Sequence, residues 1–327
     1  MDTLLHGYRA TALLYVAAKL KIADHLSSGM QTSRQLAQTL NVHEPSLHRT
    51  LRGLAAAGFC EEMGGGHFKL TSVGKKFKST SGRWEYNLAI LNGEEYAAAW
   101  NHLLESVKTG KTAFDLAFGE SPWEHRRKNP EINERFNVWL ESGAAAAGWA
   151  IAGVYDFSRC KVVADIGGNE GSLLISILQA SAATRGILMD RPHVIAAAQK
   201  RIEAAGLQSR CQVVGGNFLE AVPSGADVYI LKSVLHDSDD DQCRRILKNC
   251  SAVMKSGQSL LVVERFMPTR AADHPATIMS DLHMLAVTGG QERTLEQYQA
   301  LFTATGFTLQ KTLPLKTGHG LMVTAKS

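Results

Sequence analysis

Short apolar runs alternate with helical segments from Lys161 to the C-terminus. Each run is five to seven residues long and is bounded by polar residues or glycine, which is typical of buried strands. Such alternation predicts an α/β domain with a parallel sheet and right-handed crossovers. Only residues 314–319 separate the last two runs, so we expect that pair to be antiparallel. The expected strands cover residues 161–166, 186–190, 211–216, 227–232, 259–264, 307–313 and 320–326.

The first 80 residues follow a different pattern, in which helical periodicity gives way to a hairpin. Thr32 or Ser33 would cap the second helix, while Pro45 would open the third helix and Gly58 would close it. A run of three glycines then separates two short strands. This order predicts an all-α/winged-helix domain, with helices over 11–26, 32–40 and 44–58 and a hairpin over 59–71.

Residues 81–156 are helical and apolar in pattern, with breaks near Lys108–Lys111 and at Ser121–Pro122. We expect this segment to be a helical connector that covers a neighbouring pocket. The predicted organisation is therefore a winged-helix domain over 1–80, the connector over 81–156 and the α/β domain over 157–327.

Composition restricts the class of protein. A net charge of +4 over 327 residues is too small to indicate nucleic-acid binding. No apolar run reaches the roughly 18 to 20 residues that span a bilayer, and no signal peptide is evident, so we expect a cytoplasmic protein without membrane contact. The five cysteines show no CxxC spacing, which argues against a zinc site or a disulfide framework.

A winged helix also raises the possibility of a ligand-sensing DNA-binding regulator. His48, Arg49 and Arg52 lie on the third predicted helix and could contact phosphates. However, that helix and the first one carry extensive apolar faces that need a partner. Burying these faces against a second copy of the chain accounts for more residues than DNA binding does, so we expect a homodimer formed through the N-terminal domain.

A glycine-rich turn follows the first strand of the α/β region. The sequence DIGGNEG (165–171) places Asp165 at the end of the strand, and Gly167, Gly168 and Gly171 allow the backbone to turn sharply and approach a ligand. A tight connection without a ligand would use the same residues. The position of the turn, between a strand and a helix, indicates a nucleotide-type site.

Asp190 ends the second strand, 25 residues beyond Asp165. An acid there suits the hydroxyls of a ribose, which both NAD and S-adenosylmethionine carry. The dinucleotide pattern GxGxxG needs glycine at 167, 169 and 172, and only Gly167 fits. Alternatively, Asp190 could cap a helix that begins near Pro192.

Polar residues follow the other strands as well, and the carboxyl ends of parallel strands meet at one edge of a sheet. His236 follows the fourth strand, Glu264 ends the fifth, and Glu292 lies in a later loop. A histidine flanked by carboxylates is oriented by them and accepts a proton more readily. The acidic run Asp239–Asp241 is typical of a helix N-terminus and does not indicate a cation site.

At these residues the chain resembles the S-adenosylmethionine-dependent O-methyltransferases of the plant caffeate and bacterial polyketide or phenazine type, which dimerise through a winged-helix domain. The likeness covers nearly the whole chain. It rests on the segments LYVAAKLKIADHL, LHRTLRGLAAAGF, DIGGNEG, LMDRPHVI, LKSVLHDSDDDQCRRIL, VVERFMP and GGQERT.

The resemblance implies a Rossmann-like methyltransferase sheet and a metal-independent transfer to a hydroxyl of a small aromatic or enolic metabolite. It makes His236 the general base, with Glu264 and Glu292 orienting it. The residues that it implies for S-adenosylmethionine are Asp165, Gly167, Gly168, Asp190, Asn217, Phe218 and Lys232. Those that it implies for the acceptor are Phe136, Trp139, Leu140, Met284 and Thr288.

Three positions depart from the family's pattern. Asn169 replaces a glycine, Asn217 replaces an acid, and Ser238 replaces the tryptophan that usually follows the histidine–aspartate pair. Asn tolerates left-handed backbone angles, so the turn can survive at 169. These changes leave open a homologue that binds the cofactor without transferring a methyl group.

Overall fold

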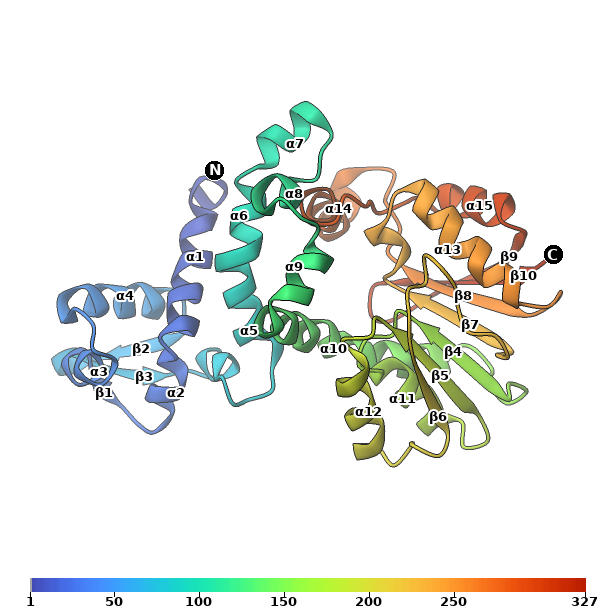
Figure 1. Ribbon diagram of the computed structural model, residues 1–327. Coiled ribbons are helices and arrows are strands. Elements are labelled where there is room, and N and C mark those ends of the chain that lie inside the picture. Colours follow the sequence, from blue (N-terminus) through green and yellow to red (C-terminus); the bar gives the residue numbers. More distant parts are fainter. Residues whose placement is uncertain (1) are drawn as a thin grey trace. The chain divides into compact units, whose positions relative to one another are not determined.

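The structure is a computed structural model that describes residues 2–327, in two compact units (Figure 1). One unit comprises Met1–Ala98 and Lys128–Ser142, and the other comprises Ala99–Arg127 and Gly143–Ser327. The predicted connector, residues 81–156, is therefore shared between the two units.

The first unit contains the predicted winged helix. Four helices precede and accompany a three-stranded sheet of order β1-β3-β2 (Figure 1). Leu36, Leu51 and Phe68 are fully buried in its core. The elements are α1 (Asp2–Lys19), α2 (Ile22–Ser27), β1 (Gln31–Thr32), α3 (Ser33–Leu40), α4 (Glu44–Ala56), β2 (Cys60–Met63), the 3-10 turn η1 (Gly64–Gly66), β3 (His67–Leu70) and the 3-10 turn η2 (Gly74–Phe77).

The prediction of one helix over 11–26 was wrong, because the chain breaks between α1 and α2. Lys21 adopts a left-handed conformation with φ +50°, which ends the regular helix. The break redirects the chain so that Ile22 and Leu26 enter the core. The short strand β1, which pairs antiparallel with β3, was not predicted from the sequence.

The local signals for the other helix ends are confirmed. The Thr32 hydroxyl accepts the N–H of Gln35 and the Gln35 side chain accepts the N–H of Thr32, which forms a capping box at α3. Pro45 lies in the first turn of α4, and Gly58 has φ +78° just after its end.

The basic residues considered for DNA contact are partly engaged within this unit. The Arg52 side chain pairs with Glu62 at 3.1 Å, and the His48 ring contacts the Ser33 hydroxyl at 3.2 Å. These contacts tie α4 to β2 and α3.

Helices occupy the predicted connector, with breaks near the predicted places. Gly110 has φ +72° between α7 and α8, and α9 begins at Pro122. The elements are α5 (Trp84–Leu91), the π-helix η3 (Asn92–Tyr96), α6 (Ala97–Trp100), α7 (Leu103–Thr109), α8 (Ala113–Phe118), α9 (Pro122–Lys128) and α10 (Pro130–Ala152).

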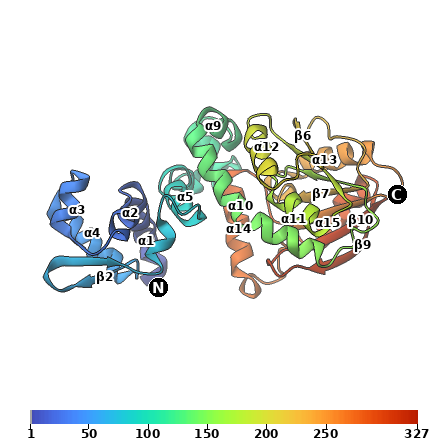
Figure 2. The ribbon, with the colours of Figure 1, turned by 90° about the horizontal axis from the view of Figure 1, so that it is seen from below.

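The second unit is built on a seven-stranded sheet of order β6-β5-β4-β7-β8-β10-β9 (Figure 1), which Figure 2 shows from below. All seven predicted strands form, and the last pair, β9 and β10, is antiparallel as predicted. β10 is also antiparallel to β8, which was not predicted. The strands are β4 (Val162–Ile166), β5 (Arg185–Asp190), β6 (Cys211–Gly215), β7 (Val228–Lys232), β8 (Ser259–Glu264), β9 (Phe307–Pro314) and β10 (Gly320–Lys326).

Helices cover both faces of this sheet, which is why its central strands are almost entirely apolar. Side chains of α11 (Ser172–Ala180) and α12 (Ile195–Ala204) form one core with one face of the sheet. Those of α13 (Asp240–Val253) and α15 (Leu295–Ala304) form a second core with the other face.

The strand order reverses between β4 and β7, and in open α/β sheets ligands bind at such a reversal. The remaining elements are the 3-10 turns η4 (Leu235–Asp237) and η5 (Ala271–Asp273) and helix α14 (Pro275–Val287).

Among the residues that the structure describes, no helix combines the length and apolar character needed to cross a bilayer.

Candidate active site

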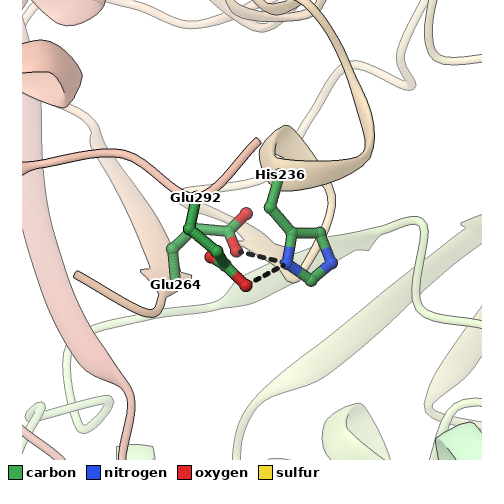
Figure 3. Close-up of side chains that lie close together, drawn as sticks. All are labelled: His236, Glu264 and Glu292. Atoms are coloured by element: carbon green, nitrogen blue, oxygen red, sulfur yellow. Dashed lines mark hydrogen bonds and ion pairs between the residues drawn. The ribbon is translucent and has the colours of Figure 1, made fainter. Parts of the chain in front are cut away.

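His236, Glu264 and Glu292 lie together at the carboxyl edge of the sheet in the second unit (Figure 3). His236 is carried by the turn η4 after β7, Glu264 ends β8, and Glu292 lies in the loop between α14 and α15. The Nδ1 atom of His236 is 3.3 Å from Glu292 Oε1 and 3.7 Å from Glu264 Oε2. The sheet thus brings together the three residues that the sequence placed at this edge.

Glu264 is fully buried and is held by the turn that carries the histidine. Its Oε1 atom accepts the backbone N–H groups of Val234 at 3.0 Å and Leu235 at 2.9 Å. A carboxylate bonded in this way fixes both its own rotamer and the start of the turn.

Glu292 is buried as well and is oriented from α14. The Ser280 hydroxyl donates to Glu292 Oε1 at 2.7 Å, and the backbone N–H of Glu292 donates to Asp281 Oδ1 at 2.8 Å. These two contacts aim the carboxylate at His236. Ser280 and Asp281 were not singled out in the sequence for this role.

A third carboxylate, that of Asp237, faces the other ring nitrogen. Its Oδ1 atom is 3.8 Å from His236 Nε2. Asp237 was not predicted as a site residue, although it directly follows the histidine in the sequence. Three carboxylates therefore surround one imidazole ring.

This arrangement shifts the pKa values in the cluster. Burial alone would lower the pKa of His236, but Glu264, Asp237 and Glu292 outweigh burial and raise the pKa to about 9. Burial raises the pKa of Glu264 to about 7 despite the opposing effect of His236. Burial also opposes ionisation of Glu292, but its hydrogen bond and ion pair with His236 hold its pKa below the ordinary value.

His236, Glu264 and Glu292 also meet the distance requirement of a metal site, since one donor atom of each lies within 4.8 Å of the others. However, Glu264 Oε1 already accepts two backbone N–H groups, and Nδ1 of His236 is the ring atom that bonds Glu292. A metal at Nδ1 would have to displace that bond.

The glycine-rich turn follows β4 and is tightly packed. Gly167 has φ +75°, and a Cβ at Gly168 would lie only 2.5 Å from an oxygen of the buried Asp165 carboxyl group. A Cβ at Gly167 would lie 3.4 Å from the Phe218 ring, which places that predicted residue beside the turn. Glycine is therefore required at both positions.

Asn169 adopts the left-handed conformation expected of it, with φ +51°. Its backbone N–H donates to Asp190 Oδ2 at 2.7 Å, so the turn and the acid of β5 are directly linked. Its side-chain Nδ2 is buried and has no hydrogen-bond partner among the described residues.

Asp190 does not cap a helix, because α12 begins at Ile195 with Val194 at its N-cap. Its Oδ1 atom accepts the N–H of Arg191 at 2.6 Å. Burial raises the pKa of Asp190, and the N–H donors of Arg191 and Asn169 oppose that effect.

The remaining predicted cofactor residues lie at the ends of β6 and β7. The Asn217 side chain bonds Glu220 and the backbone N–H of Leu219, which stabilises its own turn. Lys232 ends β7. Partial burial and, after it, the nearby charge of Lys232 lower the pKa of the half-buried His319 ring.

The predicted acceptor residues belong to both units. Phe136, Trp139 and Leu140 are on the part of α10 in the first unit, where the Phe136 and Trp139 ring centroids are 5.8 Å apart. Met284 and Thr288 are at the end of α14 in the second unit, where the Thr288 hydroxyl donates to the Met284 carbonyl at 3.2 Å. Their joint role as a pocket stays a prediction.

A second histidine, His283, lies on α14 near His236 and was not identified from the sequence. It accepts a long hydrogen bond of 3.4 Å from the Trp100 indole N–H, and the two rings stack. Burial, with the charges of Arg126 and His236, lowers the pKa of His283 to about 4. It is therefore neutral at physiological pH.

Replacing Glu264 by Gln tests the electrostatics of the cluster. The Gln carbonyl can still accept the two backbone N–H groups, whereas the charge that helps to raise the pKa of His236 is lost. The titration midpoint of His236, followed by NMR with labelled histidine and assigned by comparison with H236A, should move from about 9 toward the ordinary value near 6.5. An unchanged midpoint would contradict this account of the cluster.

Comparison with known proteins identifies the family. Residues 3–80 match the O-methyltransferase dimerisation domain, and residues 100–308 match the O-methyltransferase domain. The phenazine O-methyltransferase PhzM of Lysobacter antibioticus is 40% identical over 319 residues, which cover 98% of this chain and 93% of that protein.

Two solved structures share the whole fold. The mitomycin 7-O-methyltransferase MmcR has a TM-score of 0.94 and 32% identity, with 100% of this chain and 96% of that chain covered. NcsB1, an O-methyltransferase from neocarzinostatin biosynthesis, was solved with S-adenosylmethionine and 2-hydroxy-5-methyl naphthoic acid. It has a TM-score of 0.86 and 29% identity, with 97% and 96% of the two chains covered. The chain therefore belongs to the S-adenosylmethionine-dependent O-methyltransferases with an N-terminal dimerisation domain.

Proposed function

We propose that the protein methylates a hydroxyl group of a small aromatic or enolic specialised metabolite and that His236 is the general base. The observation that carries this proposal is the cluster of His236 with Glu264 and Glu292 at the sheet edge where the glycine-rich turn also lies. A base and a nucleotide-type turn at one edge suit the transfer of a group from a cofactor to a hydroxyl.

The residues around the turn fit S-adenosylmethionine. Gly167 and Gly168 keep the backbone free of side chains, and the Asp190 carboxylate retains lone pairs for ribose hydroxyls beyond its two backbone contacts. The buried Nδ2 of Asn169 offers a donor to a polar group of the ligand. We assign Asp165, Asn217, Phe218 and Lys232 to the same site. When bound, S-adenosylmethionine supplies an electrophilic methyl group on its sulfonium.

His236 uses its two ring nitrogens differently. Nδ1 donates to Glu292, which leaves Nε2 to accept the proton of the acceptor hydroxyl. A phenol has a pKa near 10, so its oxygen is a weak nucleophile at neutral pH until a base removes the proton. With a pKa of about 9, His236 matches the phenol closely, and proton transfer between them costs little.

The same pKa means that His236 is mainly protonated at pH 7 without ligands, with about one part in a hundred neutral. The neutral base becomes more abundant as the pH rises toward 9. An acceptor that arrives as its phenolate would instead pair directly with the imidazolium. In both cases His236 fixes the oxygen that receives the methyl group.

The acceptor class follows from the relatives and from the aromatic side chains in the chain itself. NcsB1 was solved with a hydroxynaphthoic acid, and the relative from Lysobacter antibioticus is a phenazine O-methyltransferase. We assign Phe136, Trp139, Leu140, Met284 and Thr288 to contacts with a flat ring of this kind. Aromatic side chains such as Phe136 and Trp139 can pack against a ring of this kind.

Replacing His236 by Ala tests the base. Methyl transfer, measured with a panel of hydroxylated aromatic acids and phenazines, should fall by about 10² to 10⁴-fold, because general-base help is lost. Calorimetry should show nearly unchanged affinity for S-adenosylmethionine, since the glycine-rich turn is intact. Turnover equal to that of the wild type would exclude His236 as the base.

The same assay tests metal independence and the alternative of a non-methylating homologue. Dialysis against EDTA should leave the rate unchanged, and restoration of a lost rate by a divalent cation would contradict the metal-free mechanism. Conversion of an acceptor while S-adenosylmethionine stays intact would favour the alternative.

Replacing Asn169 by Gly and by Ala tests the cofactor assignment. Both variants remove the side-chain amide. Gly adopts the left-handed conformation at φ +51° without strain, whereas Ala retains the strain of a side chain in that conformation. Both variants should bind S-adenosylmethionine about 5- to 10-fold more weakly by calorimetry, because one hydrogen bond is lost. Equal or tighter binding by N169G would mean that the amide does not contact the ligand.

We further propose that the protein is a homodimer formed through its N-terminal domain. Leu5 and Tyr8 of α1 expose 62% and 68% of their surface, and Trp84 at the start of α5 exposes 38%. Leu5 and Tyr8 lie within the match to the O-methyltransferase dimerisation domain, where exposed apolar side chains suit a partner surface. Sedimentation velocity should give twice the mass of 35.5 kDa, and the double variant L5E/Y8E should shift the protein toward monomer.

A further inference from the structure

Arg293 is a fully buried charged residue that does not take part in the proposed proton and methyl transfer. It directly follows Glu292 and is 0% exposed. Removing a guanidinium from water costs several kcal/mol, so a buried arginine is retained only where its hydrogen bonds are strong. Its contacts therefore indicate what it does.

The guanidinium of Arg293 forms hydrogen bonds on both sides of the turn that carries His236. Nη1 donates to the carbonyl of Leu235 at 2.9 Å, and Nη2 donates to the carbonyl of Ser238 at 2.8 Å. These two carbonyls flank His236 and Asp237. Nε donates to Asp240 Oδ1 at 2.9 Å, which links the same group to the first turn of α13.

The backbone before Arg293 packs against the same turn. The N–H of Gln291 donates to the His236 carbonyl at 2.9 Å. At Gly290 a Cβ would lie 2.0 Å from that carbonyl oxygen, so only glycine allows the approach. On its other side, the carbonyl of Arg293 accepts the N–H of Met267 at 2.9 Å, close to the end of β8.

The turn η4 has little support of its own. It spans only Leu235–Asp237, and the backbone bonds that close it, from Asp237 to Val234 and from Ser238 to Leu235, are long at 3.3 Å each. Short 3-10 turns have poor hydrogen-bond geometry. The orientation of the His236 ring therefore depends on groups outside the turn.

We propose that Arg293 is a positioning residue that, with the backbone of Gly290–Gln291, holds the turn Leu235–Ser238 so that the His236 ring stays aligned with Glu264 and Glu292. This inference rests on the proposed function of His236. A planar fork with five donors can bridge two carbonyls and a carboxylate at once, whereas a lysine ammonium cannot reproduce that geometry.

The experiment compares R293K and R293M with the control R244M. Arg244 lies on α13 and shares the partner Asp240 with Arg293, but its side chain is 41% exposed and both its ion-pair partners, Asp240 and Asp241, are on its own helix. A misplacement of about 1 Å can cost 10²-fold in rate, so kcat of R293M should fall by about 10²-fold and that of R293K by about 10-fold. R244M should stay within about twofold of the wild type.

Two further readouts separate positioning from a general loss of stability. Affinity for S-adenosylmethionine, measured by calorimetry, should stay within about twofold, because the glycine-rich turn does not contact Arg293. The NMR titration midpoint of His236 should move from about 9 toward 6.5 in both Arg293 variants, since a loosened ring leaves its carboxylates. If R293M does not fold, R293K alone decides the outcome.

An R293K variant with wild-type kcat and an unchanged midpoint would overturn the proposal, as would an equal loss in R244M. Failure of the proposed function gives a different result. In that case the wild type itself transfers no methyl group to any acceptor, while the His236 midpoint still reports whether Arg293 holds the ring.

Discussion

The burial of the Glu264 carboxylate at the end of β8 is the constraint on which the site depends. A fully buried carboxylate is tolerated only when its charge is compensated nearby. Here the compensation consists of two backbone N–H groups at the start of η4 and the imidazole that the same turn carries. One desolvated group therefore fixes the geometry of the turn and favours the protonated form of His236.

The rest of the site extends this arrangement. Glu292 bonds the ring from the loop after α14, and Arg293 bonds the carbonyls on both sides of the ring's attachment point. Consecutive residues thus contact the side chain and the backbone of the same turn. Because both come from one loop, a movement of that loop would change the orientation and the ionisation of the histidine together.

The geometry of the glycine-rich turn is also fixed by its contacts, but these involve backbone groups and not charges. Its residues leave no room for side chains at 167 and 168, and the Asn169 N–H joins it to Asp190 on the neighbouring strand. The substitution of Asn for glycine keeps the left-handed turn and adds a buried amide donor. The departure from the family's pattern thus adds a polar group to a surface that is otherwise backbone.

Much of this protein followed from the sequence because the signals are local. The alternation of apolar runs predicted all seven strands and the antiparallel last pair, and the rule that strand ends meet at one edge predicted the meeting of His236, Glu264 and Glu292. The residues at the helix ends also predicted α3 and α4, because helix-end signals act between residues that are close in the chain. The helix predicted over 11–26 was wrong because periodicity continues through Lys21 while the backbone turns there to bury Ile22.

Only the tertiary structure decided the remaining features, because they depend on contacts between residues far apart in the chain. Asp237 becomes part of the cluster through the direction of a turn, and Arg293 contacts residues more than 50 positions earlier. The pKa of His236 is set by burial and by three carboxylates, and no spacing in the sequence reveals the distances between these groups. The sequence determined which groups reach the carboxyl edge, and packing decided how they are oriented and charged, since burial and distance control both.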